Sequence, residues 1–448
     1  MAIFIFIISV LSVSSVVKKI LHHNSYMHVY QGAFKMDKNK YPLHEIRVLD
    51  FGWVAAGPSA TKILADMGAE VIKVESRKRP DTTRFTPDNI ERSPETDPAF
   101  HSLNRNKLGI TIDMTQPEGC ELLRKLAAKC DIVLENFYPG VMEKFGLDYE
   151  TLSKIKPDII MVSMPGLGNW GPLAKTPAYA PNLAALSGLE SMVGYEGGRS
   201  LGLQQPYSDY NAGTNSAFAA LAALIHRNRT GEGQNIEVAQ IEALVACIGE
   251  AVLDYQVTGQ IPGHKGNRHG QMAPHNNYLC EGDDKWVSIA VKTDDEWNNL
   301  VEVMAEEPGL IDAKFSTLEG RLQNETELDQ LISAWTLNRT SEEITEALQE
   351  SKVAAFPCMD IGDCFLDPHF QEREVFIPIE HPVSGDEFIA NLSWRMSETD
   401  GGVYRPAPLW GQHNRYVFEE IMGLSKEEMT RLEEKEVIQK YQEPAPIG

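Results

Sequence analysis

The feature that most constrains the fold of this chain is a strand, helix and strand pattern in residues 44–76. The run HEIRVLDFG is apolar and β-branched and ends in glycine, which is typical of a buried strand. The next run, AGPSATKILADMGAE, has a proline in its first turn and places Ile63, Leu64 and Met67 on one face, which indicates a helix. AEVIKVES predicts a second strand. Because a helix separates the two strands, we expect them to pair in parallel.

The same alternation continues along the chain. The runs KLGITIDM, CDIVLENF and PDIIMVSMPG predict three more strands, and PEGCELLRKLAAK and YETLSKI predict helices between them. A long helix rich in alanine follows within residues 211–230, and NIEVAQ predicts a strand after it. This pattern indicates an α/β class protein with a Rossmann-like large domain, in which helices cover both faces of a parallel sheet.

From about Tyr278 the pattern changes. WVSIAV predicts a lone strand, and the runs DDEWNNLVEVM, ELDQLISAW and SEEITEALQE predict helices, which together indicate a smaller α+β domain. RPAPLWGQHN is rich in proline and predicts a return linker, and SKEEMTRLEEKEVIQKY predicts a last helix. A chain of 448 residues is too long for one ordinary core, so more than one domain is expected. The predicted boundaries are an N-terminal extension over residues 1–35, a large domain over 36–260, a small domain over 275–400, and a linker with a helix that returns to the large domain over 401–448.

The N-terminal run MAIFIFIISVLSVSSVV is apolar but shorter than the roughly 20 residues that span a bilayer. Its positive charges, Lys18 and Lys19, follow the apolar run, whereas those of a signal peptide precede it. We expect residues 1–35 to be a disordered extension or a misassigned start, with the working chain beginning near Met36. A membrane anchor is the alternative.

Charge and cysteine content narrow the class of protein. A net charge of −23 argues against nucleic acid or an anionic membrane as a partner. The six cysteines are scattered without zinc-site spacing, which favours reduced thiols in a cytoplasmic protein. These are Cys120, Cys130, Cys247, Cys280, Cys358 and Cys364. Walker, G-x-S-x-G and H-E-x-x-H motifs are absent from the sequence.

Five blocks of sequence together resemble the family III CoA-transferases, which include formyl-CoA, carnitine and bile-acid CoA-transferases and the related α-methylacyl-CoA racemases. The blocks, in family order, are IRVLDFGWVAAGPSATKILADMGAEVIKVE, LNRNKLGITIDMTQPEG, DIVLENFYPGVMEKFGLDYETLSKIKPDIIMVSMPGLGNWGP, RTGEGQNIEVAQIEALV and RPAPLWGQHN. The resemblance covers roughly residues 44–420. It implies an interlocked, ring-like dimer, homomeric or heteromeric with another family III chain, that takes acyl-CoA and carboxylate substrates and uses no metal.

The resemblance also implies which residues contact coenzyme A. The loop after the first strand and basic or polar residues after later strands match the family's CoA-binding positions, with Arg77 as the expected phosphate contact. The predicted CoA-binding residues are Val54, Ala55, Ala56, Arg77, Leu103, Asn104, Arg105, Lys107, Asn136 and Lys144. The family's glycine-rich active-site loop matches Gly266, Asn267, Arg268, His269, Gly270 and Gln271. If the substrate is a dicarboxylate, Arg268, His269 and His275 are candidate cations.

One position departs from the family pattern. The aspartate that attacks the thioester in the relatives matches Ala180, just after Tyr179, and alanine can act neither as a nucleophile nor as a base. Three explanations stay open: a naturally non-catalytic subunit of a heteromeric enzyme of the succinyl-CoA:benzylsuccinate type, a relocated carboxylate such as Asp209 or Glu237, and an engineered Asp-to-Ala change. For Asp209, helix capping is the ordinary alternative. The function predicted is CoA transfer from an acyl-CoA such as succinyl-CoA to a carboxylic acid, with a racemase-like isomerase or a CoA-binding structural subunit as alternatives.

Overall fold

The computed structural model describes residues 40–85, 93–203 and 205–441. The calls on residues 1–35 lie outside the described residues. The chain forms two compact units, the first made of residues up to 190, 202–258 and 368 onward, and the second of residues 191–201 and 259–367. Within the described residues, no helix is both long enough and apolar enough to cross a membrane.

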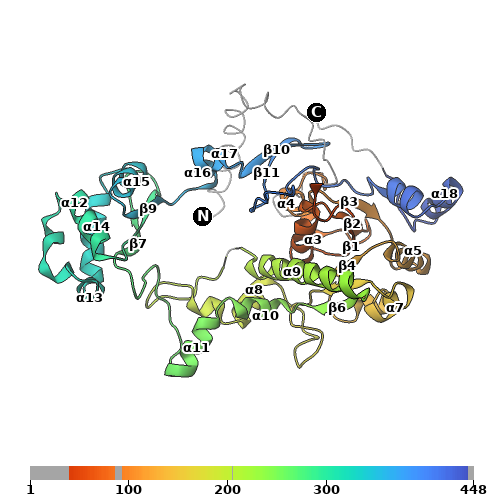
Figure 1. Ribbon diagram of the computed structural model, residues 1–448, viewed down its shortest axis with the longest axis horizontal. Helices are drawn as coiled ribbons and strands as arrows, with labels where there is room; N and C mark the ends of the chain where they lie inside the picture. The colour runs from red at the N-terminus through yellow and green to blue at the C-terminus, as the bar shows by residue number, and fades with distance from the viewer. Residues whose placement is uncertain (1–39, 86–92, 204, 442–448) are drawn as a thin grey trace, which may run out of the picture. The chain divides into compact units, whose positions relative to one another are not determined.

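The first unit is built on a six-stranded parallel sheet in the order β3-β2-β1-β4-β5-β6 (Figure 1). Its strands are β1 (Arg47–Asp50), β2 (Glu70–Glu75), β3 (Leu108–Thr111), β4 (Ile132–Glu135), β5 (Ile160–Ser163) and β6 (Gln234–Glu237). The chain winds outward from β1 to β3 and then crosses to β4 on the other side of β1. The strand order therefore reverses between β1 and β4, where open α/β sheets bind their ligands. The predicted α/β class and parallel sheet are confirmed.

Helices cover both faces of this sheet because side chains alternate along each strand. On one face, Val48 and Val71 pack with α3 (Ala56–Asp66) and α9 (Tyr207–Thr230). On the other face, Leu49 and Ile72 pack with helices that include α5 (Pro117–Ala127), α7 (Tyr149–Ile155) and α18 (Lys426–Glu434). The other α-helices of this unit are α4 (Pro98–Asn104), α6 (Val141–Phe145), α8 (Ala180–Leu186), α10 (Gln240–Ala246), α11 (Gly249–Thr258) and α17 (Pro368–Glu372).

The contact between α3 and α9 is unusually close because of one glycine. A Cβ atom added at Gly213 of α9 would lie 2.0 Å from the Ser59 hydroxyl oxygen on α3. The alanines of α9 that face the sheet, such as Ala217 and Ala220, are fully buried. This packing fixes the start of α9 against the start of α3, and both starts border the site described below.

The second unit has an antiparallel sheet in the order β7-β8-β9. The strands are β7 (His275–Leu279), β8 (Trp286–Ala290) and β9 (Ala354–Pro357), and the helices are α12 (Asp294–Val303), α13 (Leu318–Gln323), α14 (Glu325–Thr336), α15 (Ser341–Glu350) and α16 (Ile361–Leu366). The prediction that WVSIAV forms a lone strand is wrong, because β8 is the central strand and pairs on both sides. The sequence gives no clear signal for its two partner strands, because β7 (HNNYL) is largely polar and β9 (AAFP) has only four residues.

The compact units differ from the expected domain boundaries on the C-terminal side. The chain re-enters the first unit at residue 368, ahead of a hairpin of β10 (Phe376–His381) and β11 (Gly385–Ala390). Ile377 and Ile389 of this hairpin pack with Val403. The segment expected as a return linker then runs beside β3, where the Thr111 backbone N–H donates to the Asn414 side chain at 2.9 Å.

Candidate active site

A cavity of about 860 Å³ opens where the parallel strands end. Each of the six strands is followed by residues that line it, as expected at the carboxyl edge of a doubly wound sheet. These include Val54 and Ala55 after β1, Ser76, Lys78 and Arg79 after β2, Asp113 and Met114 after β3, Asn136, Phe137 and Tyr138 after β4, Gly166 and Leu167 after β5, and Gln240 after β6. Most of the other lining residues are apolar. The cavity therefore suits a ligand with a long uncharged portion and a charged end.

The loop between β1 and α3 is held in an unusual conformation at the cavity wall. Val54 has a φ of 60°, in the left-handed region, and is 42% exposed. A β-branched residue rarely adopts this conformation, and such strain gathers at functional sites. The Val54 backbone N–H donates to Asp81 at 3.2 Å. Asn136 holds Trp53, the residue before Val54, through two hydrogen bonds. The Asn136 side-chain oxygen accepts from the Trp53 N–H at 2.8 Å, and its side-chain nitrogen donates to the Trp53 carbonyl at 3.0 Å.

Four buried ionisable side chains support this loop from behind. The Lys73 ammonium lies 3.0 Å from Asp81 and donates to the Gly52 carbonyl at 2.7 Å. The Lys107 ammonium lies 3.0 Å from Asp50, whose other oxygen accepts from the Gly52 N–H at 2.7 Å. All four side chains are fully buried. Burial lowers the pKa of Lys107 to about 8, although Asp50 acts in the opposite direction. We call Asp50, Lys73, Asp81 and Lys107 the buried charge network.

The predicted CoA-binding residues divide into two sets. Val54, Ala55, Leu103 and Asn136 line the cavity. The others do not line it, namely Ala56, Arg77, Asn104, Arg105, Lys107 and Lys144. Both polar atoms of the Asn136 side chain are hydrogen-bonded to the Trp53 backbone, so Asn136 fixes the conformation of the loop between β1 and α3.

The polar and basic side chains of the LNRNK segment turn inward, although its first residue, Leu103, lines the cavity. Arg105 forms an ion pair with Asp66 at 2.6 Å, and its side chain is 4% exposed. Asn104 accepts from the Lys107 ammonium at 2.9 Å within the protein core. The prediction of these three residues as direct CoA contacts is not supported by this arrangement, because buried partners already take up their polar groups.

Basic residues reach the cavity just after β2. Lys78 and Arg79 line it, whereas the Arg77 guanidinium lies 5.4 Å from the Trp410 ring centre. Lys78 pairs with Asp113 at 2.9 Å. Arg79 is exposed and forms no ion pair within the described part of the chain. The family resemblance predicts Arg77 as the phosphate contact, whereas the structure brings Arg79, two residues later, to the cavity wall. Lys144, the other expected basic contact, is exposed on α6.

Ala180 is the first residue of α8 and lines the same cavity. Asp209 also lines it, whereas Glu237 is exposed at the end of β6 and does not. The helix α9 begins at Tyr207, so Asp209 lies inside its first turn, and no side chain caps this helix. The capping interpretation of Asp209 is therefore wrong. Burial raises the pKa of Asp209 to about 6.

Comparison with known proteins identifies the family. The model of CoA-transferase family III matches residues 43–414. The chain is a member of that family. It is 34% identical to the succinyl-CoA–D-citramalate CoA-transferase of Chloroflexus aurantiacus, over 89% of this chain and 98% of the relative. It is 35% identical to the alpha subunit of succinyl-CoA–L-malate CoA-transferase of Chloroflexus aurantiacus, over 90% of this chain and 94% of the relative. A CAIB/BAIF family protein from Brucella suis has a similar structure, with a TM-score of 0.78 and 30% identity over 85% of this chain and all of that chain.

The loop that matches the active-site loop of family III CoA-transferases lies in the second unit. The Gly266 N–H donates to the Gly194 carbonyl at 3.0 Å, and the His269 and His275 rings lie 5.3 Å apart. The Arg268 guanidinium has three carboxylates nearby, at 3.7 Å, 3.7 Å and 3.8 Å. They belong to Glu196, Glu325 and Asp329. These neighbours balance the positive charge of Arg268, which weakens its candidacy as the cation for a dicarboxylate.

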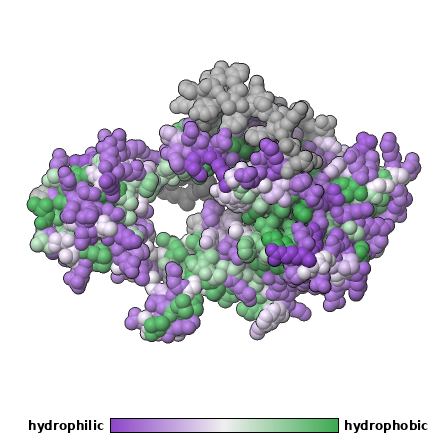
Figure 2. Space-filling view, in the orientation of Figure 1, coloured by the Kyte–Doolittle hydropathy of each residue, from purple (hydrophilic) through white to green (hydrophobic). Residues whose placement is uncertain are grey.

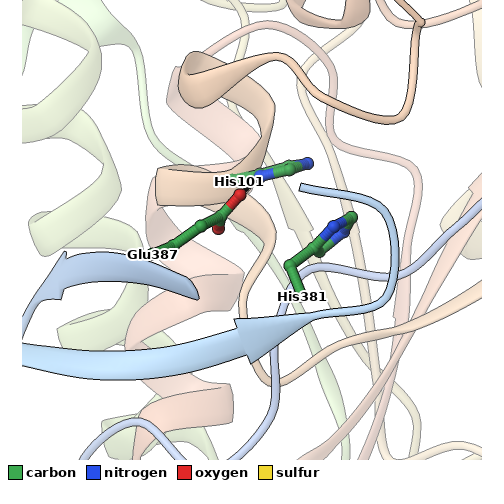
Figure 3. Close-up of side chains that lie close together, drawn as sticks. All are labelled: His101, His381 and Glu387. Carbon is green, nitrogen blue, oxygen red and sulfur yellow. Dashed lines mark hydrogen bonds and ion pairs between the residues drawn. The ribbon is translucent and has the colours of Figure 1, made fainter. Parts of the chain in front are cut away.

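One group of histidine and glutamate side chains in the CoA-transferase has the spacing of a metal site within the described residues (Figure 3). It consists of His101 on α4, and His381 and Glu387 on the hairpin of β10 and β11. One ring nitrogen of His101 lies 2.7 Å from the Glu387 carboxylate and the other lies 2.9 Å from the Glu95 carbonyl. The Nδ1 atom of His381 accepts the backbone N–H groups of residues 383 and 384. Because these hydrogen bonds occupy three of the four ring nitrogens, the arrangement works as a clip between α4 and the hairpin.

Proposed function

We propose that this chain transfers CoA from succinyl-CoA to a carboxylic acid, with the cavity at the strand ends as the CoA site. The observation that carries the proposal is the cavity lined by residues that follow all six parallel strands, in a member of a CoA-transferase family. The donor is inferred from the relatives, whose names specify succinyl-CoA. The same names include hydroxy acids with two carboxylates, so a dicarboxylate of this size is the proposed acceptor.

The chemistry of the lining fits the parts of coenzyme A. The uncharged pantetheine arm suits the apolar wall of Val54, Ala55 and Leu103. The phosphates suit Arg79 and Lys78, because a guanidinium donates two parallel hydrogen bonds to phosphate oxygens. In this proposal Ala180 stands at the position of the family's nucleophilic aspartate. The carboxylate that attacks the thioester must therefore come from elsewhere in this chain or from a partner chain.

We also propose that the working form is a dimer with a second family III chain, either identical or different. The helix α11 has no buried residue, although it carries Leu253, Tyr255 and Val257, which are 62%, 53% and 86% exposed. Figure 2 shows hydrophobic residues among hydrophilic ones on the exposed surface of this helix. Exposed apolar surface of this kind is typical of obligate interfaces. One relative is named as an alpha subunit, which supports a two-chain assembly.

The test is a transfer assay with the purified full chain. Succinyl-CoA is mixed with D-citramalate, L-malate or glutarate, and the formation of each acyl-CoA is followed by liquid chromatography. We expect one or more of these dicarboxylates to accept CoA, with release of succinate. Exchange of the α-proton of an acyl-CoA in deuterated water, without any acceptor, would favour the racemase alternative. A folded chain that binds no CoA in calorimetry would contradict the proposal altogether.

A further inference from the structure

Three acidic residues line the cavity, and two of them are already committed to ion pairs. Glu75 is buried and receives a two-point contact from the Arg84 guanidinium, at 2.9 Å and 2.8 Å. Asp113 pairs with Lys78 at 2.9 Å and accepts the backbone N–H and the hydroxyl of Thr115. Against the effect of burial, the contacts with Thr115 and Lys78 lower the pKa of Asp113 to about 2. A carboxylate held in this way is a poor nucleophile, because its charge is already stabilised.

Asp209 is the third of these acidic residues. Its carboxylate has no hydrogen bond or ion pair within residues 40–85, 93–203 and 205–441. Burial alone accounts for the rise of its pKa to about 6. At pH 7 most molecules therefore carry an ionised Asp209, and this anion is weakly stabilised by its surroundings. That combination is what a carboxylate needs to attack a carbonyl carbon.

The position of Asp209 is fixed by rigid packing. Its backbone carbonyl accepts from the Ser59 hydroxyl at 3.3 Å, and Gly213, one turn later, lies directly against Ser59. Ser59 belongs to α3, the helix that follows the strained Val54 loop. A reacting group on a well-packed helix keeps its geometry better than one on a free loop.

Two other buried carboxyl groups with a raised pKa do not compete for this role. Burial raises the pKa of Glu135 to about 7, but this side chain accepts from the Phe137 N–H at 2.7 Å and lines a separate cavity of about 60 Å³. Burial also raises the pKa of Asp66, which is held by Arg105. Neither residue lines the large cavity.

We propose that Asp209 is a catalytic residue that attacks the acyl-CoA thioester in place of a carboxylate at position 180. This inference rests on the proposed CoA-transferase function. A carboxylate oxygen of Asp209 forms a bond to the thioester carbonyl carbon, the C–S bond breaks, and CoA leaves as a thiolate. The thiolate then attacks the aspartyl carbonyl carbon of the mixed anhydride, so that succinate leaves and an aspartyl-CoA thioester remains.

The second half of the reaction reverses these steps with the acceptor acid. The acceptor carboxylate attacks the aspartyl-CoA thioester and releases the thiolate, which then attacks the acceptor's acyl carbon in the new anhydride. The Asp209 carboxylate is regenerated and the new acyl-CoA leaves. Each step exchanges one acyl bond for another, so protons and electrons balance without a further reactant.

The experiment compares the full-length chain with its Asp209→Asn variant. Transfer from succinyl-CoA is measured, and the protein is treated with hydroxylamine during turnover, which converts an activated aspartyl group to a hydroxamate that mass spectrometry locates. We expect Asp209→Asn to lower transfer by at least about 1,000-fold while CoA binding in calorimetry persists, and the hydroxamate to appear on Asp209. The matched control is Glu150→Gln, which removes an exposed acidic residue from the first turn of another helix, α7, outside the cavity.

The other outcomes separate this inference from the proposed function. Transfer that survives in Asp209→Asn would overturn the role of Asp209 and leave the CoA-transferase function intact. CoA binding without transfer or hydroxamate, with activity restored only by a second family III chain, would also overturn it and show a non-catalytic subunit. A folded wild-type chain with neither CoA binding nor transfer would overturn both.

Discussion

Charged side chains lie on both sides of the loop between β1 and α3, and the two sides differ in whether those charges form ion pairs. Behind the loop, the buried charge network pairs every charge with an opposite one. In front of it, Asp209 and Arg79 face the cavity with no ion pair in the described part of the chain. Paired buried charges hold a backbone in place, whereas unpaired charges at a cavity cost stability and remain available to a ligand. The difference teaches that Arg105 and Lys107 of the LNRNK segment hold the fold together by pairing with Asp66 and Asp50, away from the cavity.

The largest expected effect comes from breaking the buried charge network. Lys73→Met should lower the free energy of unfolding by about 3–5 kcal/mol, because it leaves Asp81 buried without its partner. Urea unfolding followed by fluorescence measures the loss. Lys78→Met is the control, since Lys78 is exposed to solvent and its pair with Asp113 should contribute far less to stability than the buried pair. Equal losses in the two variants would contradict the distinction between the two sides of the loop.

The second largest expected effect is a gain in stability, caused by the variant Asp209→Asn. Burial raises the pKa of Asp209 from an ordinary value of 3.8 to about 6, so the folded protein loses stability as the pH rises through this interval. Asn cannot ionise, and Asp209→Asn should therefore stabilise the fold at pH 7 by up to about 3 kcal/mol, the equivalent of this shift. The gain should shrink to below about 1 kcal/mol near pH 4, where Asp209 is protonated in the folded state and about half protonated in the unfolded state. Thermal unfolding at the two pH values tests this, and a variant that is less stable at pH 7 would show that Asp209 has a stabilising partner.

Much of the fold follows from the sequence because its signals are local. Each parallel strand is a short apolar run bordered by turn residues, and the helix between β1 and β2 has its proline and glycine at the expected ends. The order of the strands depends on which helix covers which face, and no short run encodes that. The polar strand β7 was missed because its side chains lack a clear alternation.

The candidate site was predictable only in part. Val54, Ala55, Leu103 and Asn136 line the cavity as expected from family resemblance. Arg105 and Lys107 do not, because their partners Asp66 and Asp50 lie 39 and 57 residues earlier in the chain. A basic residue in a sequence motif has the same appearance whether it binds phosphate or a distant aspartate, and only the fold distinguishes the two cases.

A smaller effect is expected on ligand affinity. Arg79→Ala should weaken CoA binding about tenfold, or about 1.4 kcal/mol, since one charge-assisted contact to phosphate is removed at a solvent-exposed position. The free energy of unfolding should stay unchanged, because Arg79 has no ion pair among the described residues. Lys154→Ala, which removes an exposed charge from α7, serves as the control. Calorimetry with CoA is the measurement, and equal affinities for the two variants would exclude Arg79 as a phosphate contact.

The smallest expected effect concerns the strained loop. Val54→Gly relieves the positive φ at this position, worth about 1–2 kcal/mol, but it adds backbone freedom to the unfolded chain, which costs about 0.5–1 kcal/mol. The net change in the free energy of unfolding should therefore be below about 1.5 kcal/mol and stabilising. Urea unfolding measures this change. A clear destabilisation in Val54→Gly would contradict the prediction and would show that the Val54 side chain is needed to hold the loop.

Hydrogen exchange measured by mass spectrometry on the full chain, with and without CoA, tests most directly whether the cavity at the strand ends is the CoA site. The account predicts slower exchange with CoA in residues 52–56 and 136–141, where the backbone borders the cavity. It predicts no change around Lys62 and Trp394, which line a second cavity of about 560 Å³. Protection by CoA at the second cavity, with unchanged exchange in the two strand-end loops, would contradict the account.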